Sequence, residues 1–337
     1  MLPRLHNTLI IGVGSIGERH LRCFRATERA QVSFVELRED LSRQIAERYP
    51  GVEAFSSFDA ALKHPWDAAV IATPAPFHVP QAIELLRRNI SVLIEKPLSI
   101  ELAGTDELLT VARSSQAVAG VAYVHRANPV LADMRREFLS GRFGTPVQLV
   151  ATTGQHFPTA RPAYADIYYA HRNMGGGAVH DALTHIINLG EWLVGDVDQV
   201  VADLSHQALP KVNVEDTVHV LARHGGVMAS YALNQYQAPT EIVVTLVCTH
   251  GTLRFEAHQC RWRFMEAPDS HWVDSPPITL ERDLLFVRQA NAFLDAVEGK
   301  SASLCSLEEA LATLKVNLAV LASADSRQWQ VLSQREH

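Results

Sequence analysis

The sequence has few cysteines, few lysines and no long apolar run in its 337 residues. The four cysteines stand far apart and include no Cys-x-x-Cys pair, so we expect reduced thiols rather than a disulfide framework. The apolar run behind the N-terminus covers only residues 8–11, which is too short for a signal peptide. No run approaches the ~20 apolar residues of a membrane span, so we expect a cytoplasmic protein with no membrane partner.

Basic residues are fewer than acidic ones, 30 against 37, so the formal net charge is −7 at pH 7. This balance argues against a nucleic-acid partner. Only five of the 30 basic residues are lysines, so a lysine at the end of an apolar stretch stands out. Glycine and proline, at 18 and 16 residues, are too few for a collagen-like or low-complexity chain. With 47% apolar residues, the chain is long enough for two globular domains.

Short apolar runs alternate with amphipathic stretches through residues 1–125. The runs cover residues 8–11, 31–37, 68–73, 91–94 and 117–123. The amphipathic stretches cover residues 15–27, 41–49, 79–88 and 100–114. This alternation predicts an α/β fold, with a doubly wound parallel sheet of the Rossmann type over residues 1–125.

The pattern changes in residues 126–337, for which we predict an α+β domain. Helices are expected at 129–140 and 178–194, on either side of a segment rich in Gly, Pro and Tyr. Six runs with period-two alternation then follow, at residues 199–207, 217–223, 227–235, 241–249, 252–257 and 261–266. Tight connections between neighbouring runs predict a mostly antiparallel meander. Two helices close the chain, and Ser306 with Glu309 has the spacing of a capping box.

A glycine-rich loop follows the first predicted strand, where residues 10–17 read IIGVGSIG. In the G-x-G-x-x-G pattern Gly12 permits a tight turn, Gly14 lets a pyrophosphate approach the backbone, and Gly17 allows close packing of helix on strand. The phosphates are expected on the amide groups of Ser15 and Ile16 at the positive end of the helix. The loop therefore predicts a dinucleotide-binding site.

An acidic residue follows at the distance typical of this site. Glu36 ends the second predicted strand, where a carboxylate accepts hydrogen bonds from the adenosine ribose and repels a 2′-phosphate. NAD is therefore expected as the cofactor. Arg38 lies on the same side of the strand and could neutralise a 2′-phosphate, so NADP stays possible.

Further candidate residues follow two buried strands at the edge where ligands of open α/β sheets bind. One strand runs into Glu95 and Lys96, and another runs into Thr73 and Pro74, with His78 four residues farther on. The proline after Lys96 restricts its conformation and permits a cis peptide bond. We expect these five residues to border the cofactor, with the Lys96 side chain pointing into the crevice.

A second constellation follows three consecutive glycines at 175–177. On a regular α-helix Asp181, His185 and Asn188 share one stripe, because their spacing is i, i+4 and i+7. The glycines would let a ligand or another chain approach the start of this helix closely. Asp181 and His185 have no third candidate ligand nearby in the sequence, so no metal is expected.

Together these residues resemble the Gfo/Idh/MocA family, the relatives of glucose–fructose oxidoreductase and inositol dehydrogenase. The resemblance implies that Lys96, Asp181 and His185 are the catalytic group. It also implies an open-faced sheet in the second domain that builds homodimers or homotetramers. The matching pieces are GVGSIG at 12–17, ATP at 72–74 with His78, EKP at 95–97, and GGG at 175–177 followed by Asp181 and His185.

The chemistry expected of such a group is hydride transfer between NAD(P) and a secondary alcohol or ketone of a sugar, polyol or sugar derivative. His185, with an intrinsic pKa of ~6.5, would take the hydroxyl proton. Asp181 would orient the imidazole or hold a neighbouring hydroxyl, and Lys96 would stabilise the developing alkoxide.

The substrate is expected to border the segment 156–174. Arg126, Tyr168 and Arg172 are its candidate contacts, together with Asp181 and His185. Two alternatives stay open: a non-catalytic NAD-binding regulator on the same fold, and an NAD-dependent glycosidase.

Overall fold

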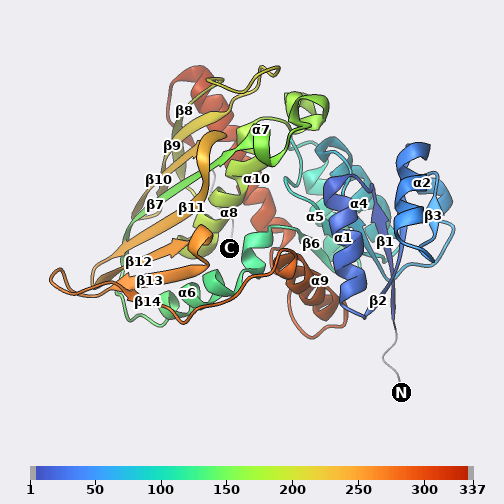
Figure 1. Ribbon diagram of the computed structural model, residues 1–337, viewed down its shortest axis with the longest axis horizontal. Coiled ribbons are helices and arrows are strands. Elements are labelled where there is room, and N and C mark those ends of the chain that lie inside the picture. Colours follow the sequence, from blue (N-terminus) through green and yellow to red (C-terminus); the bar gives the residue numbers. More distant parts are fainter. Residues whose placement is uncertain (1–4, 333–337) are drawn as a thin grey trace. The chain divides into compact units, whose positions relative to one another are not determined.

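The computed structural model describes residues 5–332 and divides the chain into two compact units (Figure 1). The first unit extends to Ala127 and includes Glu281–Leu311 from late in the chain. The second unit comprises Asn128–Leu280 and the residues from Ala312 onward. The segment Glu281–Leu311, which the sequence analysis assigned to the second domain, therefore packs with the nucleotide-binding unit.

The first unit contains a six-stranded parallel sheet in the order β3-β2-β1-β4-β5-β6. This order is that of a doubly wound fold, with β1 and β4 at the point where the direction of winding changes. Every residue of β4 and β5 is buried, as expected of parallel strands covered on both faces. The strands are β1 (His6–Ile11), β2 (Ala30–Val35), β3 (Ala54–Phe55), β4 (Ala68–Ile71), β5 (Ser91–Ile94) and β6 (Ala119–Val121).

Helices accompany this sheet where amphipathic stretches predicted them, and two more join them, the short α3 and, from late in the chain, α9. The Phe293 side chain of α9 packs edge-on against Phe24 of α1, with ring centroids 6.2 Å apart. The helix expected from residue 100 begins only at Thr105, after Gly104 in a left-handed conformation. The helices are α1 (Ser15–Ala26), α2 (Glu39–Arg48), α3 (Phe58–Ala61), α4 (His78–Arg87), α5 (Thr105–Ser114) and α9 (Leu284–Val297), with short 3₁₀ turns η1 (Ala75–Phe77) and η2 (Val124–Ala127).

The second unit contains a nine-stranded, mostly antiparallel sheet in the order β14-β13-β12-β11-β7-β10-β9-β8-β15. Apolar residues on one face form its core with the neighbouring helices. On the other face Leu221 and Met228 are 55% and 53% exposed, so the sheet is open on that side. The strands are β7 (Pro146–His156), β8 (Gln199–Ser205), β9 (Thr217–His224), β10 (Val227–Asn234), β11 (Tyr236–Cys248), β12 (Gly251–Glu256), β13 (Arg261–Met265), β14 (Val273–Asp274) and β15 (Gln330–Val331).

Strand β7 corrects the expected meander. It lies between β10 and β11, parallel to the first and antiparallel to the second, so these two strands do not pair with each other. Strand β7 was not predicted, because apolar side chains on both of its faces obscure the period-two pattern. Leu149 and Ala151 are buried in the core, whereas Val150, between them, points to the other face.

Helices and short turns complete the second unit. The capping box at the start of the last helix is confirmed, because the Ser306 N–H donates to Glu309 Oε2 over 2.8 Å and the Glu309 N–H donates to Ser306 Oγ over 3.1 Å. The α-helices are α6 (Pro129–Leu139), α7 (Phe157–Ala160), α8 (Thr184–Val194) and α10 (Leu307–Ser326), which begins in the first unit. The shorter turns are η3 (Tyr164–Asp166), η4 (Tyr168–Ala170), η5 (Arg172–Met174), η6 (Val179–Leu183) and η7 (Ala257–Gln259).

Candidate functional site

The glycine loop has the geometry that its pattern predicts. Gly12 adopts φ +83°, and a Cβ added there would lie 3.0 Å from the Ala72 carbonyl oxygen. A Cβ on Gly17 would lie only 1.9 Å from the carbonyl oxygen of Gly12. Around Gly14 there is open space instead, with no atom within 4 Å of an added Cβ. Packing therefore requires two of the glycines, and the third leaves room for a pyrophosphate to approach.

The first turn of α1 supplies the donors for such a group. Gly14 precedes the helix, and no side chain caps its N-terminus. The amides of Ser15 and Ile16 lie in the first turn, where helical N–H groups lack an acceptor four residues earlier. These residues fit the phosphates of a dinucleotide.

Glu36 is fixed beside this loop at the end of β2. Its Oε2 accepts the Val13 N–H over 3.2 Å, and its Oε1 accepts the Arg38 N–H over 3.1 Å. The Arg38 side chain is 64% exposed, and its Nε lies 3.5 Å from Glu36 Oε1. The carboxylate is therefore held where a ribose would follow the pyrophosphate, and a guanidinium stands next to it.

The His78 side chain contacts the backbone that follows β4 and β5, where the other predicted cofactor residues lie. Its ring is buried, with Nε2 2.7 Å from the Thr73 carbonyl oxygen and Nδ1 2.9 Å from that of Pro97. Burial lowers the pKa of His78 despite these two acceptors. Both ring nitrogens therefore contact the protein itself, and His78 positions the ends of β4 and β5. Pro74 precedes the 3₁₀ turn η1 at the same place.

The Glu95 side chain holds the backbone of Lys96. His20 Nε2 lies 2.7 Å from Glu95 Oε1, and the Lys96 N–H donates to Glu95 Oε2 over 3.0 Å. Burial alone would raise the pKa of Glu95, but the hydrogen bond and charge of His20 hold it below its usual value. The Lys96–Pro97 peptide bond is cis. His20 was not predicted, because its only signal in the sequence is a polar residue on the buried face of α1.

The start of the Asp181 helix departs from the regular α-helix assumed for it. Val179–Leu183 form a π-helical turn, and the α-helix begins only at Thr184. The wider turn changes the angular spacing of Asp181 and His185 from that of a regular α-helix, and their shared stripe with Asn188 stays a prediction. Asn188 is buried inside the unit and donates to Thr313 Oγ1 over 2.9 Å.

Two side chains from the preceding segment meet the buried carboxylate of Asp181. The Tyr168 hydroxyl donates to Asp181 Oδ1 over 2.9 Å, and Arg161 Nη1 lies 3.7 Å from the same oxygen. Tyr168 was predicted to contact substrate, and it contacts the predicted catalytic carboxylate directly. Arg161 had no motif to mark it in the sequence.

Two of the three glycines before this helix lie against the chain's own residues. A Cβ on Gly176 would lie 2.1 Å from the Tyr169 carbonyl oxygen, and one on Gly177 would lie 2.4 Å from Glu215 Oε1. Within the chain, the Glu215 carboxylate is a group that approaches the helix start closely at Gly177, and close approach by a ligand or another chain stays a prediction.

Glu215 also engages one of the predicted substrate residues. Its Oε1 accepts the Val179 N–H over 3.1 Å, and its Oε2 accepts a hydrogen bond from Arg172 over 2.7 Å. Arg126, another candidate, is buried in the first unit and donates to Glu309 and to the Leu304 carbonyl oxygen. Substrate contact by these two arginines stays a prediction.

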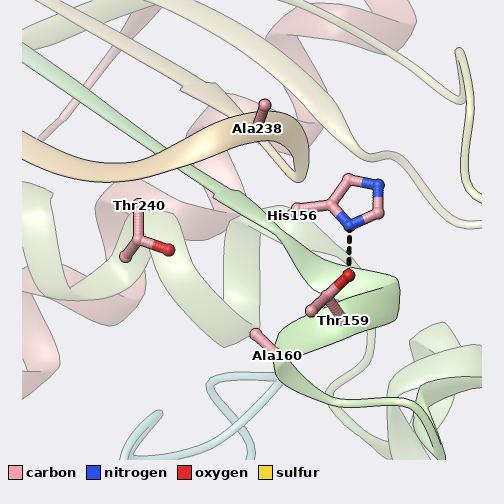
Figure 2. A pocket seen from close by; sticks show the side chains of 5 residues that line it. All are labelled: His156, Thr159, Ala160, Ala238 and Thr240. Atoms are coloured by element: carbon pink, nitrogen blue, oxygen red, sulfur yellow. Dashed lines mark hydrogen bonds between the residues drawn. The ribbon is translucent and has the colours of Figure 1, made fainter.

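A pocket of about 330 Å³ lies in the second unit, at the N-terminal end of the segment predicted to border the substrate. It forms where β11 leaves its ladder with β7, because the pairing register shifts between Tyr236 and Glu241. Figure 2 shows His156 at the end of β7 turned toward Thr159 of α7, with Nδ1 2.7 Å from the hydroxyl oxygen. Ala160, Ala238 and Thr240 complete its lining.

Two other kinds of site are not found in residues 5–332. The His, Cys, Asp and Glu side chains there form no group of three or more that could hold a metal ion. No helix in the same range is long and apolar enough to cross a membrane.

Two family models match the chain. The model described as "Oxidoreductase family, NAD-binding Rossmann fold" matches residues 6–123, and the "GFO/IDH/MocA C-terminal domain" matches residues 131–254. The chain belongs to the Gfo/Idh/MocA family. As a member of this family it is an oxidoreductase, and its first unit is an NAD-binding domain.

Curated relatives of this Gfo/Idh/MocA protein are sugar and polyol dehydrogenases. Inositol 2-dehydrogenase from Corynebacterium glutamicum is 25% identical over 305 residues, 86% of this chain and 84% of that enzyme. Myo-inositol dehydrogenase Hyg17 from Streptomyces leeuwenhoekii is 26% identical over 64% of this chain and 65% of that enzyme, just under two thirds of its length. UDP-N-acetylglucosamine 3-dehydrogenase from Acidithiobacillus ferrooxidans is 30% identical over 43% of this chain and 44% of that enzyme.

Solved structures share the fold across the whole chain. Levoglucosan dehydrogenase in complex with NADH and levoglucosan has a TM-score of 0.89 and 20% identity, and the match covers 98% of this chain and 100% of that one. The WlbA dehydrogenase from Bordetella pertussis, in complex with NADH and UDP-GlcNAcA, has a TM-score of 0.86 and 21% identity over 99% of this chain and 100% of that one.

Proposed function

We propose that the protein transfers hydride between NAD and a secondary alcohol or ketone of a sugar, a polyol or a sugar derivative. The observation that carries the proposal is Lys96, whose backbone the buried Glu95 holds at the end of β5. This strand lies next to β4 and two places from β1, which leads into the glycine loop. The names of the relatives, which act on inositol, levoglucosan and nucleotide-linked sugars, support the substrate class.

When bound, the nicotinamide would accept the hydride as the alcohol is oxidised. Proton transfer, charge stabilisation and positioning are the proposed roles of His185, Lys96 and Asp181. Lys96 donates a hydrogen bond to the reacting oxygen and stabilises negative charge there. His185 accepts the hydroxyl proton, for which an intrinsic pKa of ~6.5 is suited near neutrality. In the direction of reduction, His185 returns this proton to the oxygen.

Asp181 is the positioning carboxylate in this scheme. It is buried, with the Tyr168 hydroxyl and the Arg161 guanidinium beside it, so it has a fixed orientation and a compensated charge. We propose that Asp181, which lies one turn before the proton acceptor His185 in the helix, orients either His185 or a substrate hydroxyl.

NAD is the proposed physiological cofactor. The Glu36 carboxylate suits the two ribose hydroxyls, and its charge disfavours a 2′-phosphate. Arg38 offsets part of that charge, so NADP should bind more weakly rather than be rejected.

The test is a substrate panel read by the absorbance of NADH. The panel contains myo-inositol, levoglucosan, further hexoses and polyols, and UDP-linked N-acetylhexosamines and their uronic acids. We expect NADH formation with at least one of them. NAD binding without turnover of any member would contradict the proposal and favour the regulator. Release of an aglycone without net NADH formation would favour the glycosidase.

A further inference from the structure

A second pocket, of about 380 Å³, lies in the first unit and is lined by arginines. Its walls come from α1, from the end of α2 and from the residues that lead into α9. The chain as a whole carries a net charge of −7, so a local concentration of guanidinium groups is not a general property of its surface. The charged residues of the lining are Arg19, Arg22, Arg48, Arg282, Glu18 and Asp283.

The two carboxylates do not balance the four guanidinium groups. Arg48 lies 2.6 Å from Glu18, and the hydroxyl of Tyr49 donates to the same carboxylate over 2.9 Å. The other carboxylate, Asp283, receives two hydrogen bonds from Arg22, over 2.6 and 2.9 Å. The pocket therefore keeps an excess of two positive charges.

The excess lies on the two remaining arginines. Arg282 is exposed at the rim, and Arg19 Nε stands 3.5 Å from Asp283 Oδ1. The pKa of Asp283 is lowered, first by its hydrogen bond from Arg22 and then by the charges of these arginines. Three guanidinium groups thus share a single carboxylate.

Arg19 also carries a buried donor, its Nε, which lies 3.5 Å from Asp283 Oδ1 without forming a hydrogen bond to it. This Nε makes no hydrogen bond within the described part of the chain. The guanidinium lies over the ring of Phe286, 4.9 Å from the centroid. Burial lowers the pKa of Arg19, although Asp283 raises it. The Arg19 side chain as a whole is 32% exposed and lines the pocket, so its guanidinium can still donate hydrogen bonds to an anion there.

We propose that this pocket binds the phosphate group of a small molecule. A phosphate dianion matches the excess of two positive charges, and its oxygens accept the forked N–H groups of several guanidiniums at once. A dicarboxylate distributes the same charge over a longer distance. Its lining includes neither Glu36 nor Arg38, the residues proposed for the ribose side of the dinucleotide site.

The test is calorimetric titration of the full chain with sodium phosphate at constant ionic strength. Saturating NADH must be present, because Ser15 lines the pocket and also follows the glycine loop, where free phosphate could bind. We expect saturable binding in the millimolar range. Arg282→Ala, at an exposed position that does not disturb the fold, should weaken it about tenfold or more.

Two further variants separate the pocket from general charge effects. Arg19→Gln removes a guanidinium and its charge from the lining and should also weaken phosphate binding about tenfold. Arg88→Ala removes an exposed arginine that pairs with Glu84 on α4, outside the pocket, and should leave binding unchanged. Equal binding by the parent chain and both pocket variants would overturn the proposal. Succinate that binds as tightly as phosphate would overturn the assignment to a phosphate group.

Discussion

We propose that a single side chain, that of Glu36, decides which dinucleotide fits the first unit. Glu36 accepts the Val13 amide at the start of the glycine loop, so the carboxylate and the loop form one structure. The residue was predictable from its distance to the glycines, because a ribose follows the pyrophosphate at a fixed spacing. Its contact with Arg38 was predictable in part, since period two places both on one side of the strand.

NAD should bind at least tenfold more tightly than NADP, a difference of ~1.4 kcal/mol, because Glu36 repels the 2′-phosphate. Glu36→Ser should narrow this gap. Calorimetric titration with both cofactors measures it, and Glu39→Ser, at an exposed position on α2, is the matched control. Equal affinities in the parent chain would mean that Arg38 dominates.

Elements with clear periodicity were predictable, and those that depend on distant residues were not. The buried strands β1, β4 and β5 and helix α1 lie within a few residues of their predicted bounds. The π-helical turn at Val179–Leu183 could not be foreseen, because Glu215, which holds its first amide, stands 36 residues away from Val179 in the sequence. His20 and Glu95 were missed as a pair for the same reason.

Gly177→Ala should show how closely Glu215 approaches this turn. Gly177 has φ +92°, and the added Cβ would meet the carboxylate at 2.4 Å, so we expect a loss of about 3 kcal/mol in the free energy of unfolding. Gly141→Ala is the control, with φ +82° and no atom within 4 Å of the new Cβ. It should cost only about 1 kcal/mol, from backbone strain alone. Urea unfolding measures both, and equal losses would show that Glu215 moves away at no cost.

Ion pairs at the end of helix α9 connect it to the rest of the first unit, and their contribution to stability should depend on pH. Hydrogen bonds from Arg29 first, then from Lys300 and His6, lower the pKa of Glu298 to about 2. Because the folded-state pKa lies below the ordinary value, this charge stabilises the fold above about pH 4.5, and the contribution is lost as the pH falls toward 2.

Glu298→Gln should therefore lower the free energy of unfolding by a constant amount from pH 7 down to about pH 5. Below that the difference from the parent chain should shrink, as the parent's own carboxylate becomes protonated. Urea unfolding at several pH values measures it. Glu281→Gln, at an exposed position before α9, should have little effect at any pH, and a pH-independent loss in Glu298→Gln would contradict the ion-pair explanation.

At the scale of the whole molecule, the chain builds each unit from segments far apart in sequence. The nucleotide-binding unit takes α9 from the end of the chain, and Arg29 pairs with Asp295 and Glu298 there. Local sequence patterns contain no information about contacts between distant segments. A domain boundary drawn from composition therefore placed α9 with the residues that precede it in the sequence, in the second domain. The parallel order of the first sheet was predictable, because short strands joined by helices leave few alternatives. The position of β7 was not, since it pairs with strands about 80 residues later.

The most direct test of the proposed chemistry is the turnover number of Lys96→Ala and His185→Ala on a verified substrate. If both side chains act on the reacting oxygen, each substitution should lower kcat by ~10²–10⁴. NAD affinity should change little in His185→Ala, and the double variant should lose less than the product of the single effects. The pH profile of kcat/KM should rise with a pKa near that of histidine and flatten in His185→Ala. Near-normal turnover in His185→Ala, with Lys96→Ala inactive, would contradict the assignment of His185 as the proton acceptor and move that role to Lys96.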